Sequence, residues 1–504
     1  MAPRSQEPPD NKQAPALDPV DRKDLSSGLI TLGAVSEQNL PETAVRESLN
    51  FNFDPIGAAQ LRKGITRLGN ALPGTILGLY QYVDTVNLSA PHSQFLAVSG
   101  TACYYLNGNS FTAIRSSLTN GQKARFTTFL NQVFMVNGAD QTAWWDGAAG
   151  SFSTTGNAAS APVGSFVENF KLRVYIWNAN SRLYYSSVAS VTQTPGIVWN
   201  TDPNTGQWVD VSPQDGDFPT AMQRFRTTML LFKTNHIYRL FDVGSADTDP
   251  YIGVGTSSQE SVIETKQGVY FHHQTGFFQY NIYGVVQEIS RPIWDIILAI
   301  PSSSYSSVAG WLEADGDHIS WSVGNVTVRG TAYTNLVVRY TISTETWTHY
   351  SYPTQFVTAI RRMPYYNDGT TLWATAGDSS GNVYLMNNGL TDDGKPISYS
   401  LVHRWDYLDD LLSTRKNVMI ANFCHVGGAG SNVSYQTEDQ DPDALNDWSK
   451  HRIGQLKTIN TGFNTVNAKG RKIRFRIWGQ SSGPQFLYNG YEIIGATNEF
   501  ITFQ

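Results

Sequence analysis

Residues 200–241 constrain the fold most, because their pattern recurs in outline along the chain. They hold a short alternating run after Trp208, a turn at Asp215-Gly216-Asp217, and two strand-like segments at 226–232 and 236–241. Short runs with a period of two, separated by Gly, Asp, Asn and Pro, are typical of antiparallel strands. The pattern therefore predicts a repeating β architecture.

Further units with this pattern follow one another between residues 76 and 395. We place the units at residues 95–108, 125–152, 165–187, 200–241, 268–289, 309–350 and 372–389. A spacing of roughly 35 to 50 residues is typical of propeller blades. The sequence therefore predicts an all-β fold whose main domain, residues 76–395, is a β-propeller of about seven blades.

The two ends of the chain differ from this middle part. Residues 1–26 are rich in Pro, Asp, Lys and Gln, which predicts a disordered N-terminal tail. Residues 27–75 form an extended leader with few strands, and we expect it to contact a neighbouring subunit or an adaptor protein. After Lys395-Pro396 the sequence pattern changes, and we predict that residues 396–504 form a separate β-sandwich-like domain.

Charge and cysteine content exclude several classes of protein. The net charge is −6, from 36 basic and 42 acidic side chains, whereas a protein that grips nucleic acid usually carries a basic excess. A mildly acidic surface would still let double-stranded DNA pass without holding its phosphates. Only two cysteines are present, Cys103 and Cys424, which excludes a disulfide scaffold.

No segment predicts export or a membrane span. The N-terminus lacks the apolar core of a secretory signal. The longest apolar run, residues 293–301, is too short to cross a bilayer. We expect a soluble protein, made in a reducing compartment, with no membrane insertion.

Catalytic and metal motifs were sought among the acidic and histidine residues. The Asp-Gly-Asp runs at 215–217 and 315–317 supply carboxylates, but Asp-Gly is an ordinary turn dipeptide. Neighbouring strand residues point to opposite faces, so His272-His273 and Cys424-His425 do not readily share one ion. We therefore predict no catalytic residue, no cofactor and no metal ligand at these positions.

An acidic loop at 438–443 leaves one alternative open. Glu438, Asp439, Asp441 and Asp443 are dense enough to suggest a calcium loop. The Gly that makes the sharp turn of an EF-hand loop is absent, as is its terminal Glu. We favour a solvated loop, and the sequence leaves ion binding undecided.

Tryptophans offer a second functional reading. Trp144-Trp145 beside Asp146-Gly147 could stack on sugars, as in a carbohydrate- or receptor-binding propeller. One Trp in a blade core and one against the next blade is the structural alternative, which we favour. A glycan-cleaving propeller enzyme is a weaker alternative, because no Ser-x-Asp-x-Gly-x-x-Trp turn is present.

Two basic clusters are candidates for contact with a partner or with a DNA channel. In the strand 471–479, alternate residues place the basic side chains on one face and Ile473, Phe475 and Ile477 on the other. A solvated outer face is the alternative that we favour for the basic side. The candidate contact residues are Lys472, Arg474 and Arg476, together with Arg62, Lys63 and Arg67 in the leader.

Four segments, in order, resemble those of tail proteins of short-tailed bacteriophages. Residues 137–152 read NGADQTAWWDGAAGSF, and residues 215–241 read DGDFPTAMQRFRTTMLLFKTNHIYRLF. Residues 272–293 read HHQTGFFQYNIYGVVQEISRPI. Residues 50–69, NFNFDPIGAAQLRKGITRLG, are similar to a leading segment of these proteins, although Gly64-Ile65 stands where Pro-Gly is usual. The resemblance covers most of residues 46–390.

This resemblance is to the tail nozzle (tail tubular) and packaged-DNA stabilisation proteins, and it implies a function. Such proteins are structural, non-enzymatic parts of the virion tail, assembled in the bacterial host cytoplasm. They form a homo-oligomeric ring, usually a hexamer, below the portal-adaptor protein and next to tail fibre, spike or needle proteins. The ring closes the DNA channel and conducts double-stranded DNA during ejection.

Overall fold

The protein is described here by a computed structural model, in which the chain divides into two compact units. One unit comprises residues 1–62, 329–331 and 398–504, and the other comprises residues 63–328 and 332–397. The structure describes residues 17, 19–32, 39–53, 57–83, 93–147, 150–189, 196–201, 207–243, 245–246, 251–360, 366–367, 371–407, 415–427, 431–437, 452–456, 464–481 and 486–499.

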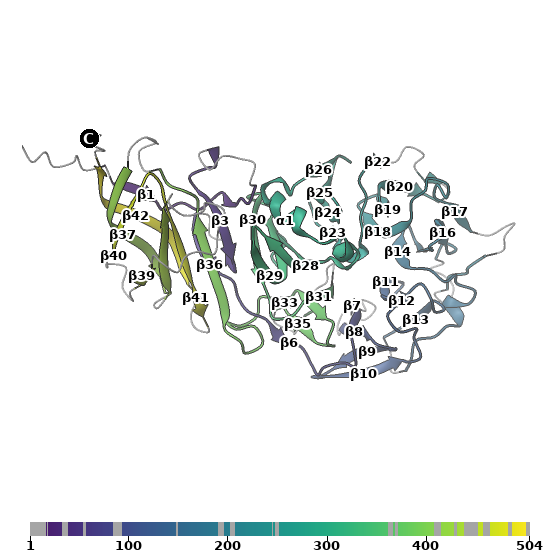
Figure 1. Cartoon of the computed structure of the whole chain (residues 1–504). Helices are drawn as coiled ribbons and strands as arrows, with labels where there is room; N and C mark the ends of the chain where they lie inside the picture. Colours follow the sequence, from purple (N-terminus) through teal and green to yellow (C-terminus); the bar gives the residue numbers. More distant parts are fainter. Residues whose placement is uncertain are drawn as a thin grey trace, which may run out of the picture. The chain divides into compact units, whose positions relative to one another are not determined.

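Within the described part of residues 63–397, seven groups of neighbouring strands form the blades of a propeller (Figure 1). Blade 1 contains β7 (Ile76–Val83), β8 (Ser93–Ser99), β9 (Ala102–Asn107) and β10 (Ser110–Arg115). Blade 2 contains β11 (Arg125–Phe129), β12 (Gln132–Val136) and β13 (Ala143–Trp145). Blade 3 contains β14 (Phe166–Phe170), β15 (Arg173–Trp177), β16 (Arg182–Tyr185) and β17 (Trp208–Asp210).

The remaining blades follow in chain order. Blade 4 contains β18 (Pro219–Phe225), β19 (Thr228–Lys233), β20 (His236–Asp242), β21 (Ser245–Ala246) and β22 (Tyr251–Ile252). Blade 5 contains β23 (Ile263–Glu264), β24 (Gly268–His273), β25 (Gly276–Asn281) and β26 (Val286–Glu288). Blade 6 contains β27 (Ala309–Leu312), β28 (His318–Val328), β29 (Thr331–Thr341) and β30 (Thr346–Ser351). Blade 7 contains β31 (Phe356–Ala359), β34 (Thr375–Asp378), β35 (Val383–Leu385) and β6 (Thr66–Arg67).

Contacts between the first strands of successive blades close the circle. β7 contacts β11, β11 contacts β14, and β14 contacts β18. The short helix η3 (Gln259–Ser261) contacts both β18 and β27, and β23 also contacts β27. β27 contacts β31, which returns to β7. The fold class predicted from the sequence, a propeller of about seven blades, is therefore confirmed.

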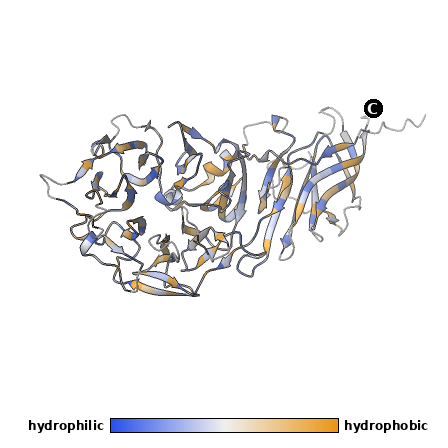
Figure 2. Cartoon of the chain, turned by 180° about the vertical axis from the view of Figure 1, so that it is seen from behind, coloured by the Kyte–Doolittle hydropathy of each residue, from blue (hydrophilic) through white to orange (hydrophobic). Residues whose placement is uncertain are grey.

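Apolar residues pack between neighbouring blades, which is why the alternating strands fold in this way. Figure 2 shows hydrophobic and hydrophilic residues interspersed along the blade strands. The layer between blades 1 and 2 includes Val98, Met135 and Trp145, and the layer between blades 1 and 7 includes Ile76 and Val383. Burial of each face against the next blade removes this apolar area from water.

Blade 7 is completed by a strand from the other end of the propeller sequence. β6 pairs with the edge of β35, with Tyr384 opposite Arg67 and Leu385 opposite Thr66. The approach needs Gly64, because a Cβ at that position would lie 1.9 Å from the backbone oxygen of Thr391. The blade predicted at residues 372–389 was therefore incomplete, since a distant strand leaves no mark in the local pattern.

The residues of the opening pattern also belong to two blades rather than one. β17 (Trp208–Asp210) is the outer strand of blade 3, and blade 4 begins only at Pro219. The two strand-like segments correspond to β19 and β20, which are separated by Thr234-Asn235 as the pattern predicted. Short helices connect some blades, among them η4 (Arg291–Ile293), α1 (Trp294–Ala299) and η5 (Ser302–Ser307). No helix in the described part of the chain is long and apolar enough to cross a membrane.

The other unit is a β-sandwich. One sheet has the order β4 (Phe51–Asn52), β5 (Ala59–Leu61), β42 (Leu487–Glu499), β37 (Arg415–Val426), β40 (Asn464–Gly470), and β1 (Val20–Arg22) pairs with β42. The second sheet includes β2 (Gly28–Leu29), β3 (Ala44–Leu49), β36 (Ile397–His403), β41 (Ile473–Ser481), β38 (Asn432–Thr437) and β39 (Arg452–Gln455). The predicted β-sandwich-like domain is therefore present.

Aromatic side chains join the two sheets of the sandwich. Phe475 of β41 packs against Phe423 and Tyr491 of the opposite sheet, with ring centroids 5.3 and 4.7 Å apart. Phe51 of β4 packs edge-on against Tyr399 of β36 at 5.6 Å. The N-terminal segment thus helps to build the sandwich core, since an apolar face needs a partner sheet.

The N-terminal strands differ from the sequence expectation. β1 lies inside residues 1–26, which composition predicts to be disordered, yet Val20 pairs with Ile493 and is buried. Residues 27–75, predicted as a leader with few strands, supply β2, β3, β4 and β5 to the sandwich and β6 to the propeller. Composition misses β1, β3, β5 and β6 because each has a partner strand hundreds of residues away.

Candidate functional site

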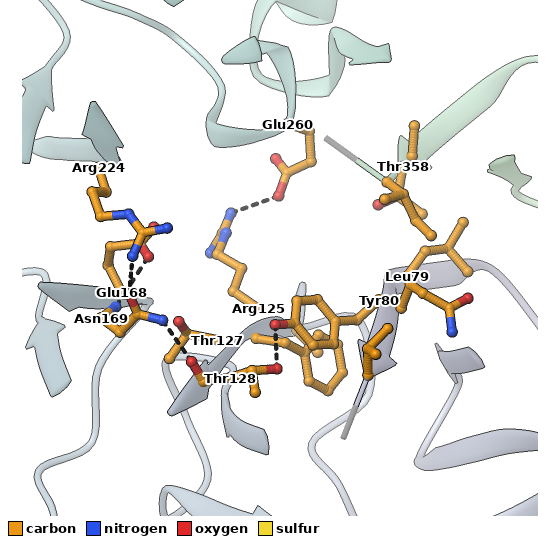
Figure 3. Close-up of a pocket in the computed structure, with 16 residues that line it drawn as sticks. Leu79, Tyr80, Arg125, Thr127, Thr128, Glu168, Asn169, Arg224, Glu260 and Thr358 are labelled. Carbon is orange, nitrogen blue, oxygen red and sulfur yellow. Dashed lines mark hydrogen bonds and ion pairs between the residues drawn. The ribbon is translucent and has the colours of Figure 1, made fainter. Parts of the chain in front are cut away.

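A cavity of about 250 Å³ lies on the propeller axis, between the first strands of five blades. Because first strands surround the axis of a propeller, this cavity is enclosed by residues far apart in the sequence. Its walls are residues 79–81 of β7, 125–128 of β11, 168–169 of β14, Arg224 of β18, residues 358–360 at the end of β31, and Glu260 of η3 (Figure 3).

Hydrogen bonds run from blade to blade around this cavity. The Tyr80 hydroxyl of blade 1 lies 2.6 Å from the hydroxyl of Thr128 in blade 2. Asn169 of blade 3 donates to the Thr128 carbonyl oxygen at 2.5 Å, and Arg224 of blade 4 donates to the Asn169 side-chain oxygen at 2.5 Å. We call Tyr80, Thr128, Asn169 and Arg224 the axial belt, and it ties four consecutive blades together (Figure 3).

Three belt residues occupy the same position in their strands. Thr128, Asn169 and Arg224 each stand next to last, followed by Phe129, Phe170 and Phe225. Alternation sends each phenylalanine into an apolar layer between blades and leaves the polar neighbour to bond across to the preceding blade. The sequence reasoning missed these residues, although a polar residue before Phe, repeated at the end of the first strands of blades 2, 3 and 4, is the signal that marks them.

An ion-pair cluster forms part of the cavity wall. Glu260 Oε1 accepts a bond from Arg125 at 2.9 Å, and Glu260 Oε2 accepts one from Lys123 at 2.9 Å. Arg125 also donates to the Ser165 carbonyl oxygen at 2.8 Å. Glu260 lies in the segment between blades 4 and 5, so these bonds join it to blade 2 across the axis (Figure 3).

The cavity wall is polar and charged, and part of it is shielded from water. Gln81, Thr127 and Glu168 are each exposed by 4% or less. Two arginines, Arg125 and Arg224, are balanced by two carboxylates, Glu168 and Glu260. Buried polar groups of this kind are costly unless they are hydrogen-bonded, so their gathering at one point marks a candidate binding site.

A second cavity, of about 880 Å³, lies among the turns of blades 4, 5 and 6. It is lined by residues 224–226, 264–267, Leu312 and 314–317. Asp315 and Asp317 belong to the second Asp-Gly-Asp run, and both are engaged in the turn. Asp315 accepts the backbone N–H of Asp317 at 2.9 Å, and Asp317 accepts from the Ser343 hydroxyl.

The first Asp-Gly-Asp run is a turn as well. Asp217 accepts the backbone N–H groups of Thr234 and Asn235 at 3.1 and 2.6 Å. Asp215 pairs with buried Lys233 at 2.7 Å. Burial raises the pKa of the Asp215 carboxyl, but the bonds from Lys233 and Tyr238 outweigh it and hold the pKa below its ordinary value. The prediction that these aspartates are turn residues is confirmed.

The adjacent histidines lie apart, as predicted. His272 packs between Phe277 and Tyr305, with ring centroids at 5.1 and 5.5 Å, whereas the His273 ring bonds the hydroxyl of Thr275. Burial lowers the pKa of His272 to about 3, so its ring is neutral near pH 7. Among the described residues, no group of three or more His, Cys, Asp and Glu could hold a metal ion.

The tryptophan pair follows the structural alternative. Trp145 is buried in the apolar layer between blades 1 and 2, next to Tyr82 and Phe152. Trp144 packs against the layer between blades 2 and 3, and its indole N–H donates to the Thr155 carbonyl oxygen at 2.7 Å. Neither residue lines the axial cavity.

The leader's basic residues occupy different surroundings. Arg62 is buried, and its Nε donates to the Asn50 side-chain oxygen at 2.8 Å. Lys63 is exposed. Arg67 pairs with Asp393 at 2.7 Å, with both side chains partly exposed, and so supports the closure of blade 7. The structure therefore does not bring these three side chains to one surface.

The basic strand 471–479 corresponds to β41. The face of this strand that carries the basic side chains is not a solvated outer face. Ile473, Phe475 and Ile477 are buried, as the alternation predicted. Arg474 is only 1% exposed, with its guanidinium 4.4 Å from the ring centre of Trp405 and its Nε bonded to Gln436. The favoured reading of a solvated face is wrong at Arg474, because Trp405 and Gln436 cover it.

The flanking basic residues of β41 have similar partners but more exposure. The Lys472 ammonium lies 4.6 Å from the same Trp405 ring. Arg476 is half-buried and donates to the Ser400 hydroxyl at 2.9 Å. In the same unit, the His425 ring bonds the Gly427 carbonyl oxygen, and Cys424 is a free thiol. The acidic loop at 438–443 lies outside the described residues.

No protein-family model and no curated protein matches this chain. Among solved structures, BBS1N in complex with ARL6DN has a TM-score of 0.41 at 8% identity and covers 65% of this chain and 98% of its own. A chain of the Mitotic Checkpoint Complex scores 0.40 at 10% identity, covering 63% and 94%. The extracellular domain of the putative hybrid two component system BT4673 from B. thetaiotaomicron scores 0.41 at 11% identity, covering 68% and 45%. Similarities this weak carry no argument about function.

Proposed function

We propose that this protein is a structural, non-enzymatic component of a short-tailed bacteriophage tail, a nozzle-like ring that closes the DNA channel and conducts DNA during ejection. The resemblance supports this, and the observation that carries the proposal is that two of the resembling segments follow successive strands of two successive blades. Residues 215–241 contain β18, β19 and all but the last residue of β20 in blade 4. Residues 272–293 run from the last two residues of β24 through β25 and β26 of blade 5 to η4.

The leading segment supports the same proposal. Residues 50–69 contain β4 and β5 of the sandwich, and then β6, which closes the propeller. The segment therefore has a defined structural role that explains why it precedes the blades in this order. The Gly64-Ile65 departure is also accommodated, because Gly64 permits the close approach to Thr391.

The axial cavity indicates where DNA would pass. About 250 Å³ holds roughly eight waters at ~30 Å³ each, which is far too little for a duplex. The Glu260 ion pairs also cross the axis. DNA would therefore pass through the lumen of a ring of subunits. Such a ring closes when one surface of each copy binds a different surface of the next copy, head to tail.

Native mass measurement of the full-length protein tests this proposal. The proposal predicts a closed ring with a mass near six times the 55.8 kDa of one chain, and negative-stain class averages with a central hole. The matched control is the same protein at the lowest measurable concentration, where the ring and the free chain should be the main species. A protein that stays monomeric, both alone and with its portal-adaptor protein, would contradict the proposal.

A further inference from the structure

The axial cavity gathers buried polar groups that the nozzle role does not use. Gln81, Thr127 and Glu168 come from blades 1, 2 and 3, and all three are nearly inaccessible to water. The Nε of Arg125 is buried and has no hydrogen-bond partner among the described residues. An amide, a hydroxyl, a carboxylate and a guanidinium therefore converge on one small space.

We propose that this cavity binds a neutral saccharide unit. Hydroxyl groups act as both donors and acceptors, so a polyhydroxylated ring can satisfy an amide, a carboxylate and a guanidinium together. The site is built from the first strands of a closed propeller, which hold these groups in place without the ligand.

Charge on the wall favours a neutral ligand over an ion. Among the lining residues, Arg125 and Arg224 are matched in number by Glu168 and Glu260. Glu260 is already bonded to Arg125 and to Lys123, which lies outside the lining, Arg224 is bonded to Asn169, and Glu168 accepts the Asn169 backbone N–H at 3.0 Å. An anion would face the Glu168 carboxylate in a shielded site, and a cation would face the guanidinium of Arg224, so each would meet a repulsive partner.

Size and apolar surface agree with one sugar ring. A volume of about 250 Å³, equal to roughly eight waters, suits a single monosaccharide. Tyr80 and Phe126 line the cavity as a stacked pair with centroids 5.4 Å apart, and Leu79 and Ile360 also line it. These side chains offer an apolar surface for the C–H face of a sugar.

The size of the cavity leaves two forms of the ligand open. The bound ring can be a free monosaccharide or the terminal unit of a glycan chain. Both ligands present the same hydroxyl groups to the cavity. Methyl glycosides, whose anomeric oxygen is blocked, represent the terminal unit of a glycan chain.

Saturation-transfer NMR on the full-length protein tests the proposal with named probes. The probes are glucose, galactose and N-acetylglucosamine, their methyl glycosides, and glucuronate and glucosamine as charged comparators. At least one neutral sugar should receive saturation and bind more tightly than either charged one. A methyl glycoside that binds as well as its parent indicates a terminal unit, and one that does not bind indicates a free sugar.

A matched pair of variants locates the site. Glu168→Gln keeps the side-chain shape but removes the charge and one acceptor, so Kd for the bound sugar should rise about ten-fold, as expected for loss of a hydrogen bond to a charged group. Glu288→Gln makes the same change on β26, away from the cavity, and should leave Kd unchanged. Equal Kd values in the unaltered protein and Glu168→Gln would overturn the proposal.

Hydrogen exchange on the unaltered protein keeps the test decisive if Glu168→Gln fails to fold. A bound sugar should slow exchange in peptides covering residues 79–83, 124–128 and 168–169. Binding with protection elsewhere, tighter binding of a charged sugar, or no saturation transfer to any neutral sugar would each overturn the proposal. The result is independent of ring formation, so the nozzle proposal can fail while this one stands.

Discussion

The propeller and the sandwich are both built of antiparallel sheets, but they take their strands from the sequence in different ways. In blades 1 to 5, neighbouring strands in a sheet follow one another along the chain. In the sandwich, β1 pairs with β42 and β3 pairs with β36, so both ends of the chain meet in each sheet. Blade 7 is intermediate, because three of its strands are local and β6 is not.

This difference predicts which regions lose stability when the N-terminal segment is removed. A sheet made of local hairpins closes short loops, whereas a sheet made of distant strands must first close a very long one. The sandwich and blade 7 therefore depend on the N-terminal segment, and blades 1 to 5 do not. The buried arginines of the two regions also differ in their role. In the propeller, arginines bond from one blade to the next, whereas Arg474 of the sandwich is covered by Trp405 and Gln436.

Removing residues 1–62 should have the largest effect. Loss of β1, β3, β4 and β5 leaves β42 and β36 with open edges, whose backbone groups then lack partners. Hydrogen exchange should show β37, β41 and β42 unprotected, while β8, β15 and β19 keep their protection. Continued protection of β37 and β42 in the truncated chain would show that the sandwich does not need its distant strands.

Replacing the enclosed arginine should rank next. Arg474→Ala removes the stacking on Trp405 and leaves buried Gln436 without this donor, and we expect a loss of about 3 kcal/mol in the free energy of unfolding. Arg476→Ala, on the same face but half-buried, is the matched control and should cost about 1 kcal/mol. Urea denaturation followed by tryptophan fluorescence measures both, and equal losses would refute the distinction.

Acid should destabilise both regions through buried histidines. Burial lowers the pKa of His349 in the propeller and of His403 in the sandwich to about 3. Their stabilising contribution is complete above the ordinary pKa of about 6.5 and is lost as pH falls toward 3, because only the unfolded chain takes up the protons.

Phenylalanine variants isolate this effect in each region. Relative to the unaltered protein, His349→Phe should gain about 1.4 kcal/mol for each pH unit below about 6.5. His403→Phe should show the same slope from a lower starting value, because the Tyr488 hydroxyl loses a partner 2.9 Å away. Free energies of unfolding measured between pH 7.5 and 5.5 decide this, and parallel curves for variant and parent would contradict it.

The smallest effect should come from the ion pair beside β6. Asp393→Asn breaks the pair with Arg67, but both side chains are more than 30% exposed, so we expect a loss below about 1 kcal/mol. Closure of blade 7 depends on backbone pairing instead, so Gly64→Ala, which forces a clash with Thr391, should cost more. Thermal melts of the two variants show which one loses more stability. A larger loss in Asp393→Asn than in Gly64→Ala would contradict the closure of blade 7 by backbone pairing.

The sequence pattern predicts what is local. The seven blades, the turn aspartates and the placement of Trp144 and Trp145 all follow from alternation and turn residues within a few tens of positions. Strand β6, strand β1 and the cover over Arg474 could not be predicted in this way, because each depends on a partner far along the chain.

The axial belt is a different case. Thr128, Asn169 and Arg224 carry a repeated mark, a polar residue before Phe at the end of a first strand. The mark becomes visible only when the blades are aligned on one another, since the bonded residues are 41 and 55 positions apart. The cavity that they surround therefore needed the structure, because the pattern of a single strand does not say which side chains meet on the axis.

Cryo-electron microscopy of particles of the phage that encodes this chain decides the proposed function. The proposal predicts six copies in a ring below the portal-adaptor protein, each with a seven-bladed density and a lumen between the copies wide enough for a duplex. Density for this chain outside the tail, or particles that lack it altogether, would contradict the proposal.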